Sequence, residues 1–279
     1  MKYKNILVHL DNSNGCRNRL EAAFSLARDF EGQLTGLFVV PNYVVPSYVE
    51  AQISVDLITD VTERALARAR ETLKGYEKMA KDAGVEMQAH VLEGQLIPML
   101  REHSKYADLM LLGQDDPDDP DNASYGLADA LLFEGACPCL IVPHSGKLAA
   151  PGKRVLLTWN ASRESAHALR EAMPILKRAE TVVVLSSEPD GGESDLANGH
   201  PHAEALSRLL ESHGIEAVSS GISDPDLNVS DAIVDQAEDM DADLIIMGAY
   251  GHTRLREIIL GGVTRDLLKR APACLFLAH

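Results

Sequence analysis

Four glycines gather near the end of the chain, where a strand-like segment passes into a helix-like one. The stretch MGAYGHTRLREIILGGVTRDLL places them at Gly248, Gly251, Gly261 and Gly262. A glycine-rich turn lets the backbone approach an anion closely, and the start of the next helix offers unpaired N–H groups with a partial positive charge. The glycines are therefore placed where they could admit a phosphate ester. The alternative explanation is a tight turn followed by close helix packing.

The matching place earlier in the chain carries carboxylates instead of glycines. The stretch LGQDDPDDPDNASYGLADALL holds five aspartates within residues 115–121, and Gly126 alone remains near the last glycine position. Carboxylates repel a phosphate, and the repulsion grows as water is excluded. We therefore expect the phosphate site to be lost in this copy.

Three other groups of residues could bind a metal or react. The aspartates of 115–121 supply hard oxygen ligands for Ca²⁺ or Mg²⁺, but the loop lacks the pattern of an EF-hand and its prolines favour a solvated turn. His200 and His202 could chelate zinc, without a clear third ligand. Cys137 and Cys139 share one face of a strand, where core packing is the alternative to a metal or thiol site.

The elements that must position these residues occur in the same order in both halves of the chain. In the first half we expect strands at 4–11, 34–40, 85–91, 107–113 and 137–143, with helices at 17–30, 55–83, from 95 and at 123–134. In the second half we expect strands at 153–160, 181–187, 215–222, 241–248 and 273–279, with helices at 162–178, 202–213, 228–240 and after 253. Strands alternating with helices predict a parallel sheet covered on both faces.

The amino-acid sequence repeats as well as the order of the elements. YADLMLLG matches DADLIIMG, LVHLDNS matches LLTWNAS, and GACPCLIVP matches RAPACLFLA. A period of about half the chain indicates duplication of a whole domain, and the break falls in the linker-like stretch 143–153. We therefore predict an α/β protein with two doubly wound parallel-sheet domains, at 1–146 and 152–279.

Composition narrows the class of protein. The 279 residues include 46% hydrophobic residues and a formal net charge of -16. Binding to nucleic acid or to an anionic membrane depends on Lys and Arg, so this balance argues against both partners. No apolar run approaches the roughly 20 residues of a membrane helix. The four cysteines are too few for a disulfide framework, which favours the cytoplasm.

The glycine segment resembles a known signature. Gly248, Gly251 and Gly261 have the intervals of the G-2x-G-9x-G-[S/T] pattern of ATP-binding universal stress proteins. The first and last strands of each half also resemble those of that family, so the chain is similar to a tandem universal stress protein. The resemblance implies Rossmann-like domains of the adenine nucleotide alpha hydrolase type. It also implies that the last strands, PCLIVP and ACLFLA, pair the two halves as a pseudo-dimer, and that a further homodimer forms.

The resemblance implies an adenine nucleotide, ATP with or without Mg²⁺, at the carboxyl edge of the second sheet. Mapped onto this chain, the adenine end involves the ends of the first two strands, and the ribose and phosphates involve the glycine segment. The implied site residues are Asn160, Ser162, Ser186, Gly248, Gly251, His252, Gly261, Gly262, Val263 and Thr264. For His252 the alternative is an exposed turn residue. Trp159, the only tryptophan, precedes Asn160 and would report binding by its fluorescence.

Two departures from the family pattern predict weaker binding in the second half. Asn160 stands where the family has a strand-end aspartate, and Gly262 stands where it has Ser or Thr, while Thr264 is two residues further on. A lost hydrogen bond to a charged group costs about 1.5–3 kcal/mol, which is one to two decades in affinity. In the first half Asp11 and Ser13 keep the strand-end pair, but the glycine intervals are gone.

The expected function is that of a regulatory protein that binds an adenine nucleotide in the second domain and acts on an unidentified protein partner. The glycine segment has no lysine, and no Ser-His-Asp order is evident, so an enzyme would be at most a slow ATPase. One alternative is a scaffold that binds no nucleotide or takes another small ligand. Another is a thiol- or metal-dependent stress sensor.

Overall fold

The computed structural model describes residues 3–42, 55–122, 126–146, 150–186, 201–221, 228–249 and 262–279. The first repeat contains β1 (Asn5–Leu10), α1 (Cys16–Phe30), β2 (Gln33–Pro41), α3 (Val55–Asp82), β3 (Met87–Gly94), α4 (Leu96–Ser104), β4 (Leu109–Gly113), α5 (Leu127–Glu134) and β5 (Cys139–Val142). The second contains β6 (Arg154–Trp159), α6 (Arg163–Leu176), β7 (Thr181–Ser186), α7 (Pro201–Ser212), β8 (Val218–Gly221), α8 (Val229–Asp239), β9 (Leu244–Gly248), α9 (Gly262–Arg270) and β10 (Cys274–Ala278).

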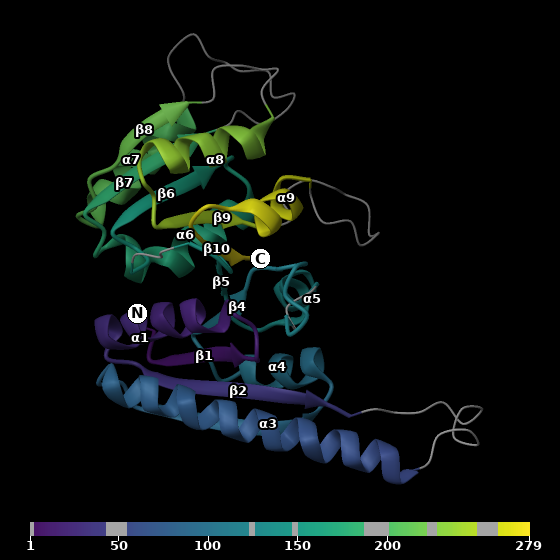
Figure 1. Ribbon diagram of the computed structural model, residues 1–279. Helices are drawn as coiled ribbons and strands as arrows, with labels where there is room; N and C mark the ends of the chain where they lie inside the picture. The colour runs from purple at the N-terminus through teal and green to yellow at the C-terminus, as the bar shows by residue number, and fades with distance from the viewer. Residues whose placement is uncertain are drawn as a thin grey trace.

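The alternation of strands and helices predicted from the sequence is confirmed in both repeats (Figure 1). One helix differs from its predicted start, because α5 begins at Leu127 rather than at 123. The described part of α9 begins at Gly262. Residues 123–125 and 250–261 lie outside the described part of the chain, so the earlier portion of each prediction stays a prediction.

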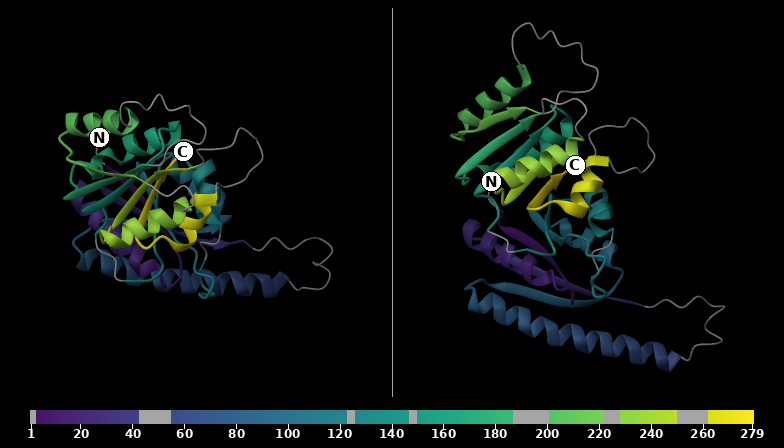
Figure 2. Two further views of the ribbon diagram at one scale, coloured as in Figure 1. Left: turned by 90° about the horizontal axis from the view of Figure 1, so that it is seen from above. Right: turned by 45° about the horizontal axis from the view of Figure 1, so that its top comes forward.

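The strands of both repeats form one sheet. Its ten strands run in the order β3-β2-β1-β4-β5-β10-β9-β6-β7-β8. Neighbours within each repeat are parallel, whereas β5 and β10 pair antiparallel, with Cys139 opposite Leu277 and Ile141 opposite Leu275. This pairing confirms that the last strands join the two halves. Figure 2 shows the sheet continuing from one repeat into the other.

Two apolar layers cover the two faces of the sheet. Successive strand residues point to opposite faces, so Val8 packs in the layer of α1, α3, α6 and α7, and Leu7 packs in the layer of α4, α5, α8 and α9. The central strand β4 is buried at all of its residues, and β9 at all but its last. A strand buried on both faces is apolar throughout, as LMLLG and LIIMG are.

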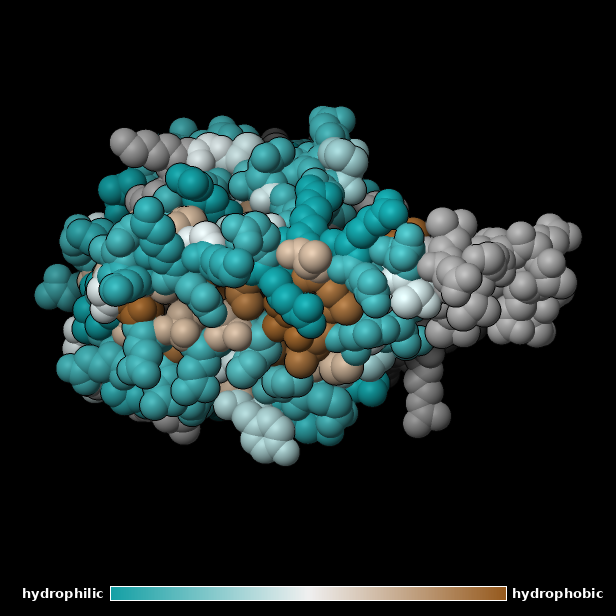
Figure 3. Space-filling view, turned by 60° about the horizontal axis from the view of Figure 1, so that its bottom comes forward, coloured by the Kyte–Doolittle hydropathy of each residue, from teal (hydrophilic) through white to brown (hydrophobic). Residues whose placement is uncertain are grey.

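The face in Figure 3 is mostly hydrophilic, with apolar side chains in its centre and in smaller patches toward its edges. Among the residues that the structure describes, no helix combines the length and apolarity needed to cross a bilayer.

Candidate functional site

The carboxyl ends of β6, β7 and β9 lie together at one edge of the second repeat. Trp159 at the end of β6 pairs with Ser186 at the end of β7, so Asn160, the next residue, lies beside that strand end. β9 is the neighbour of β6 on its other side and ends at Gly248. The structure therefore brings Asn160, Ser186 and Gly248 to one edge.

A tight turn links β6 to α6. The side-chain oxygen of Asn160 accepts a hydrogen bond from the backbone N–H of Ser162 at 3.1 Å. Ser162 is the N-cap of α6, and its hydroxyl accepts the N–H of Ser165 at 3.1 Å. Between them Ala161 has a φ of 56°, in the left-handed region that alanine avoids. The hydrogen bonds of Asn160 and Ser162 within the chain thus stabilise the start of α6.

Gly248 lies against the backbone of α6. A Cβ added at Gly248 would overlap the backbone of Glu164 and Ser165 in the first turn of that helix. The absence of a side chain therefore lets the end of β9 approach the start of α6. This gives Gly248 a packing role in addition to the ribose contact that the family resemblance implies.

The first turn of α9 contains three predicted site residues. Gly262 opens the helix and is exposed, and no described atom lies within 4 Å of the place that a Cβ would take there. Val263 is half-buried, and Thr264 is 3% exposed. The other predicted residues of the glycine segment, Gly251, His252 and Gly261, lie outside the described residues.

Two hydrogen-bond donors at the end of β6 have no acceptor among the residues that the structure describes. The indole N–H of Trp159 is buried and has no acceptor there. The amide nitrogen of Asn160 also donates to no described residue, because only its oxygen is used by the turn. Donors of this kind suit the ring nitrogens of a base. The strand end of the second repeat is therefore polar and uncharged.

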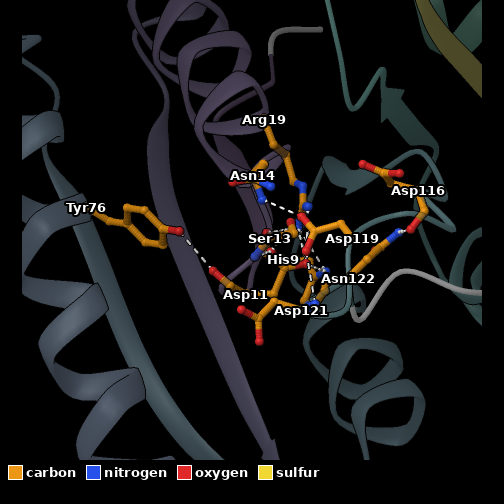
Figure 4. Close-up of polar contacts among 10 residues, drawn as sticks. All are labelled: His9, Asp11, Ser13, Asn14, Arg19, Tyr76, Asp116, Asp119, Asp121 and Asn122. Carbon is orange, nitrogen blue, oxygen red and sulfur yellow. Dashed lines mark hydrogen bonds and ion pairs between the residues drawn. The ribbon is translucent and has the colours of Figure 1, made fainter.

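The equivalent strand end of the first repeat is closed by a buried ion pair (Figure 4). Both η nitrogens of Arg19 lie 3.3 Å from one carboxylate oxygen of Asp11, and the other oxygen accepts the hydroxyl of Ser13 at 2.5 Å and its N–H at 3.0 Å. Arg19 also donates to the carbonyl of His9 at 2.7 Å. Asp11 is 3% exposed, so each of its oxygens is engaged inside the repeat.

The charges in this cluster fix one another. Burial opposes the ionisation of Asp11, but the guanidinium of Arg19, the neighbouring His9 and the two hydrogen bonds from Ser13 together outweigh it and hold the pKa of Asp11 below its usual value. Burial lowers the pKa of His9 to about 4, so its ring is neutral at pH 7. Its Nδ1 lies 3.0 Å from Nη1 of Arg19 and accepts that hydrogen bond.

The second repeat lacks the three ionisable residues of this cluster and keeps only its serine, as Ser162. The match of LVHLDNS to LLTWNAS places Thr158 and Asn160 at the positions of His9 and Asp11, and Ala168 follows Ser162 by the same six residues as Arg19 follows Ser13. Ala168 is buried, as Arg19 is. One strand end is therefore neutralised internally by paired charges, and the other carries none.

The acidic loop folds back onto the first repeat rather than standing free in solvent. Asp119 accepts the backbone N–H of Asn14 at 2.7 Å, close to the end of β1 (Figure 4). Asp121 pairs with Arg68 of α3 at 2.7 Å. The sequence predicted a solvated turn, and that prediction is partly wrong, because backbone N–H groups and an arginine fix the carboxylates of the loop.

At the start of α5, too, a carboxylate of the chain accepts a backbone N–H that could otherwise bind an anion. Asp115, two residues after β4, accepts the N–H of Gly126 at 3.2 Å, and Gly126 is the N-cap of α5. One carboxylate oxygen of Asp116 lies 3.3 Å from Nδ1 of His144. The N–H groups that a phosphate would need at this edge are therefore in contact with the chain's own carboxylates.

Metal and thiol chemistry find little support in the described residues. No group of three or more His, Cys, Asp or Glu there could hold a metal ion, and His200, one of the two predicted zinc ligands, lies outside them. All four cysteines are free, and Cys137 alone among them is not fully buried. Burial raises the pKa of Cys137 and of Cys274 to about 12, so neither is a thiolate at pH 7.

Sequence reasoning missed Arg19 and His9. The signal was present, because Arg19 lies three residues after Cys16 and four before Ala23, both buried on α1. An arginine on the apolar stripe of a helix needs a buried acceptor, and the strand-end Asp11 was the available one. His9 gave no comparable signal, since its neighbours on β1 are apolar on both sides.

Comparison with known proteins agrees with this architecture. Residues 2–143 and 152–277 each match the model of the Universal stress protein family. Universal stress protein MJ0531 of Methanocaldococcus jannaschii is 27% identical over 151 residues, 52% of this chain and 85% of that protein. Universal stress protein MJ0577 of the same organism is 51% identical over 39 residues, 14% of this chain and 24% of that protein.

A solved structure extends the likeness over both repeats. The crystal structure of a universal stress protein from Archaeoglobus fulgidus covers 99% of this chain and 96% of its own, with a TM-score of 0.76 at 18% identity. At that identity the likeness concerns the fold. Together with the two family matches, it accounts for the paired sheets, and the chain belongs to the universal stress protein family as a tandem of two of its domains.

Proposed function

We propose that the second repeat binds an adenine nucleotide, ATP in the first instance, at the edge formed by Asn160, Ser186, Gly248 and the start of α9. The observation that carries the proposal is the contrast between the two strand ends. Asp11 is closed by Arg19, whereas the position of Asn160 is uncharged and has an unspent donor. The spacing of the glycine segment, as in ATP-binding members of the family, supports the same site.

The first repeat takes no nucleotide in this proposal, so the chain has one site. Asp119 and Asp115 contact the N–H groups of Asn14 and Gly126, and a phosphate would have to displace them. Displacement would leave two carboxylates beside an anion, a like-charge contact that costs more as water leaves.

Family membership supports a role in stress response. We propose that the nucleotide state of the second repeat alters a surface recognised by a protein partner, in the cytoplasm, with slow hydrolysis of ATP as the catalytic alternative. The β5–β10 pairing already uses the last strands within the chain. A homodimer would therefore need another surface.

Titration with a fluorescent ATP analogue tests the proposal. We expect one site per chain, quenching or enhancement of Trp159 emission, and weaker binding by Asn160→Ala. Gly262→Ser restores the hydroxyl of the family pattern and is expected to tighten binding about ten- to a hundredfold. The matched control is Ser13→Ala in the first repeat, which leaves affinity unchanged. Two equivalent sites, or no binding of any adenylate by the wild-type chain, would refute the proposal.

The main alternative is a scaffold without nucleotide. It is distinguished by the acid-soluble extract of the purified protein, which absorbs at the adenine maximum only if ATP or AMP copurifies. A thiol sensor is disfavoured by the raised pKa values of Cys137 and Cys274. Thiol titration of the native chain would support a sensor only if buried cysteines reacted without denaturant.

A further inference from the structure

A small cavity between the two repeats is lined by residues of α5 and α9. Figure 1 shows α9 of the second repeat above α5 of the first. Its volume is about 30 Å³, which is room for one or two water molecules and not for a metabolite. From the first repeat Asp115 and Asp129 line it, and from α9 of the second repeat Arg265 and Lys269 line it. Acids of one repeat thus face cations of the other.

The charges across this cavity act on one another. Burial raises the pKa of Asp129, and the charges of Arg265 and Lys269 oppose that rise. Burial and the nearby Asp129 raise the pKa of Asp115, and the hydrogen bond from Gly126 and, less strongly, the charge of Lys269 oppose that rise. The two cations therefore favour the ionised carboxylates, and the carboxylates attract α9 toward the first repeat.

A direct hydrogen bond crosses the same seam at the other end of α9. The side-chain amide of Gln114 donates to the carbonyl oxygen of Ala271, just beyond the last turn of the helix, at 3.4 Å. Gln114 is 7% exposed, so this bond is shielded from water. By the match of YADLMLLG to DADLIIMG, Gln114 follows β4 where Ala249 follows β9, and alanine has no such donor.

We infer that the first repeat positions α9: Gln114, Asp115 and Asp129 hold the helix whose first residue, Gly262, stands at the proposed phosphate position of the second repeat. This inference rests on the proposed function. It gives Asp115, which contacts the N–H of Gly126 in the first repeat, a second role, because together with Asp129 it faces Arg265 and Lys269. Gln114, Asp115 and Asp129 are positioning residues, since none of them touches the proposed ligand edge.

The positioning role and a simple electrostatic effect predict opposite changes in nucleotide affinity. If Asp115 and Asp129 acted only as distant negative charges, their neutralisation would strengthen the binding of an anionic nucleotide. If they hold α9, neutralisation loosens the helix and weakens binding. The direction of the change therefore separates the two explanations.

The experiment uses the full chain and the fluorescent ATP analogue. We expect Asp115→Asn/Asp129→Asn to weaken binding about two- to thirtyfold. The matched control, Asp118→Asn/Glu93→Gln, removes two exposed acids of the same repeat away from the cavity and leaves affinity unchanged or slightly higher. In the background Arg265→Met/Lys269→Met, the same two acid substitutions weaken binding by less, because the cations across the cavity are gone. Unchanged or tighter binding by the cavity variant overturns the inference.

Hydrogen exchange keeps the two proposals separable. The amides of residues 262–270 are expected to exchange faster in Asp115→Asn/Asp129→Asn, and in Gln114→Leu, than in the control variant. If the wild-type chain binds no nucleotide, the proposed function fails, while exchange in α9 still decides whether the first repeat holds the helix. Equal exchange in all variants overturns the positioning role even when the wild-type chain binds ATP.

Discussion

The guanidinium of Arg19 lies 3.3 Å from the carboxylate of Asp11 in the interior of the first repeat, and the two side chains are 1% and 5% exposed. An ion pair so deeply buried is expensive to break, because removal of one partner leaves the other charge without compensation. It joins α1 to the end of β1, the point at which the second repeat has Ala168 and Asn160 instead.

Loss of the arginine alone is expected to destabilise the chain strongly. Arg19→Met leaves the buried Asp11 carboxylate without its counter-charge. It should lower the free energy of unfolding, measured by urea denaturation, by about 3–5 kcal/mol. Arg17→Met, at an exposed position on the same helix, is the control and should cost well under about 1 kcal/mol. The triple variant His9→Thr/Asp11→Asn/Arg19→Ala copies the second repeat and should be less destabilised than Arg19→Met. A triple variant that is less stable than Arg19→Met would contradict this account.

The neutral ring of His9 predicts a pH dependence of stability. Its pKa is about 4 in the folded chain, against the ordinary value of 6.5, so between these pH values the unfolded chain binds more protons than the folded one. Stability from this group is therefore complete above pH 6.5 and falls as the pH falls, by about 2 kcal/mol at pH 5. The pKa of Asp11 is below its ordinary value of 3.8, so Asp11 acts only at lower pH.

The measurement compares urea unfolding at pH 7.5 and pH 5 in the wild-type chain and in His9→Thr. The difference between the two pH values should be smaller in the variant by about 2 kcal/mol. Other acids of the chain titrate equally in both proteins and cancel in this comparison. An identical difference in both would mean that His9 does not remain neutral in the folded chain.

Much of the fold follows from local pattern. LMLLG and LIIMG are apolar throughout, which predicts strands buried on both faces. The internal repeat predicts two copies of one parallel sheet, and in the structure these join into a single sheet of ten strands. The pairing of β5 with β10 needed the family resemblance, because nothing in PCLIVP alone states its partner. The start of α5 was harder, since its N-cap Gly126 offers no side-chain hydrogen bond.

The candidate site was predictable in type and not in detail. Spacing indicated which residues meet at the carboxyl edge, but partners far apart in sequence decide what each does. Asp119 contacts Asn14 and Asp121 contacts Arg68, and both contacts depend on how the loop crosses the edge. The sequence alone indicates that the loop is acidic. Its tertiary contacts, which the sequence does not reveal, hold its carboxylates in place as hydrogen-bond acceptors.

Ala161 predicts a stabilising substitution at the candidate site. Its φ of 56° is costly for alanine and free for glycine, so Ala161→Gly should raise the free energy of unfolding by about 1 kcal/mol. The same chemical change at the exposed Ala67 of α3 should lower it by about 1 kcal/mol, because glycine weakens a helix. Urea denaturation of both variants should therefore give opposite signs. Destabilisation by Ala161→Gly would show that the left-handed backbone there is not strained.

Gly248 offers the converse test, in which a methyl group is added. Gly248→Ala would overlap the backbone of Glu164 and Ser165 and should cost about 1–3 kcal/mol of stability. Gly75→Ala within α3 meets no described atom within 4 Å and should gain roughly 0.5–1 kcal/mol.

The two roles of Gly248 then separate by comparing stability with affinity. If Gly248 serves only the packing of β9 on α6, then second-site substitutions that make room at the start of α6 in Gly248→Ala should restore stability and nucleotide affinity together. If Gly248 also lies by the ribose, affinity stays low after stability has recovered. Unchanged stability in Gly248→Ala would contradict the close contact with α6, because a new methyl group there has no space unless the helix start moves away from the strand.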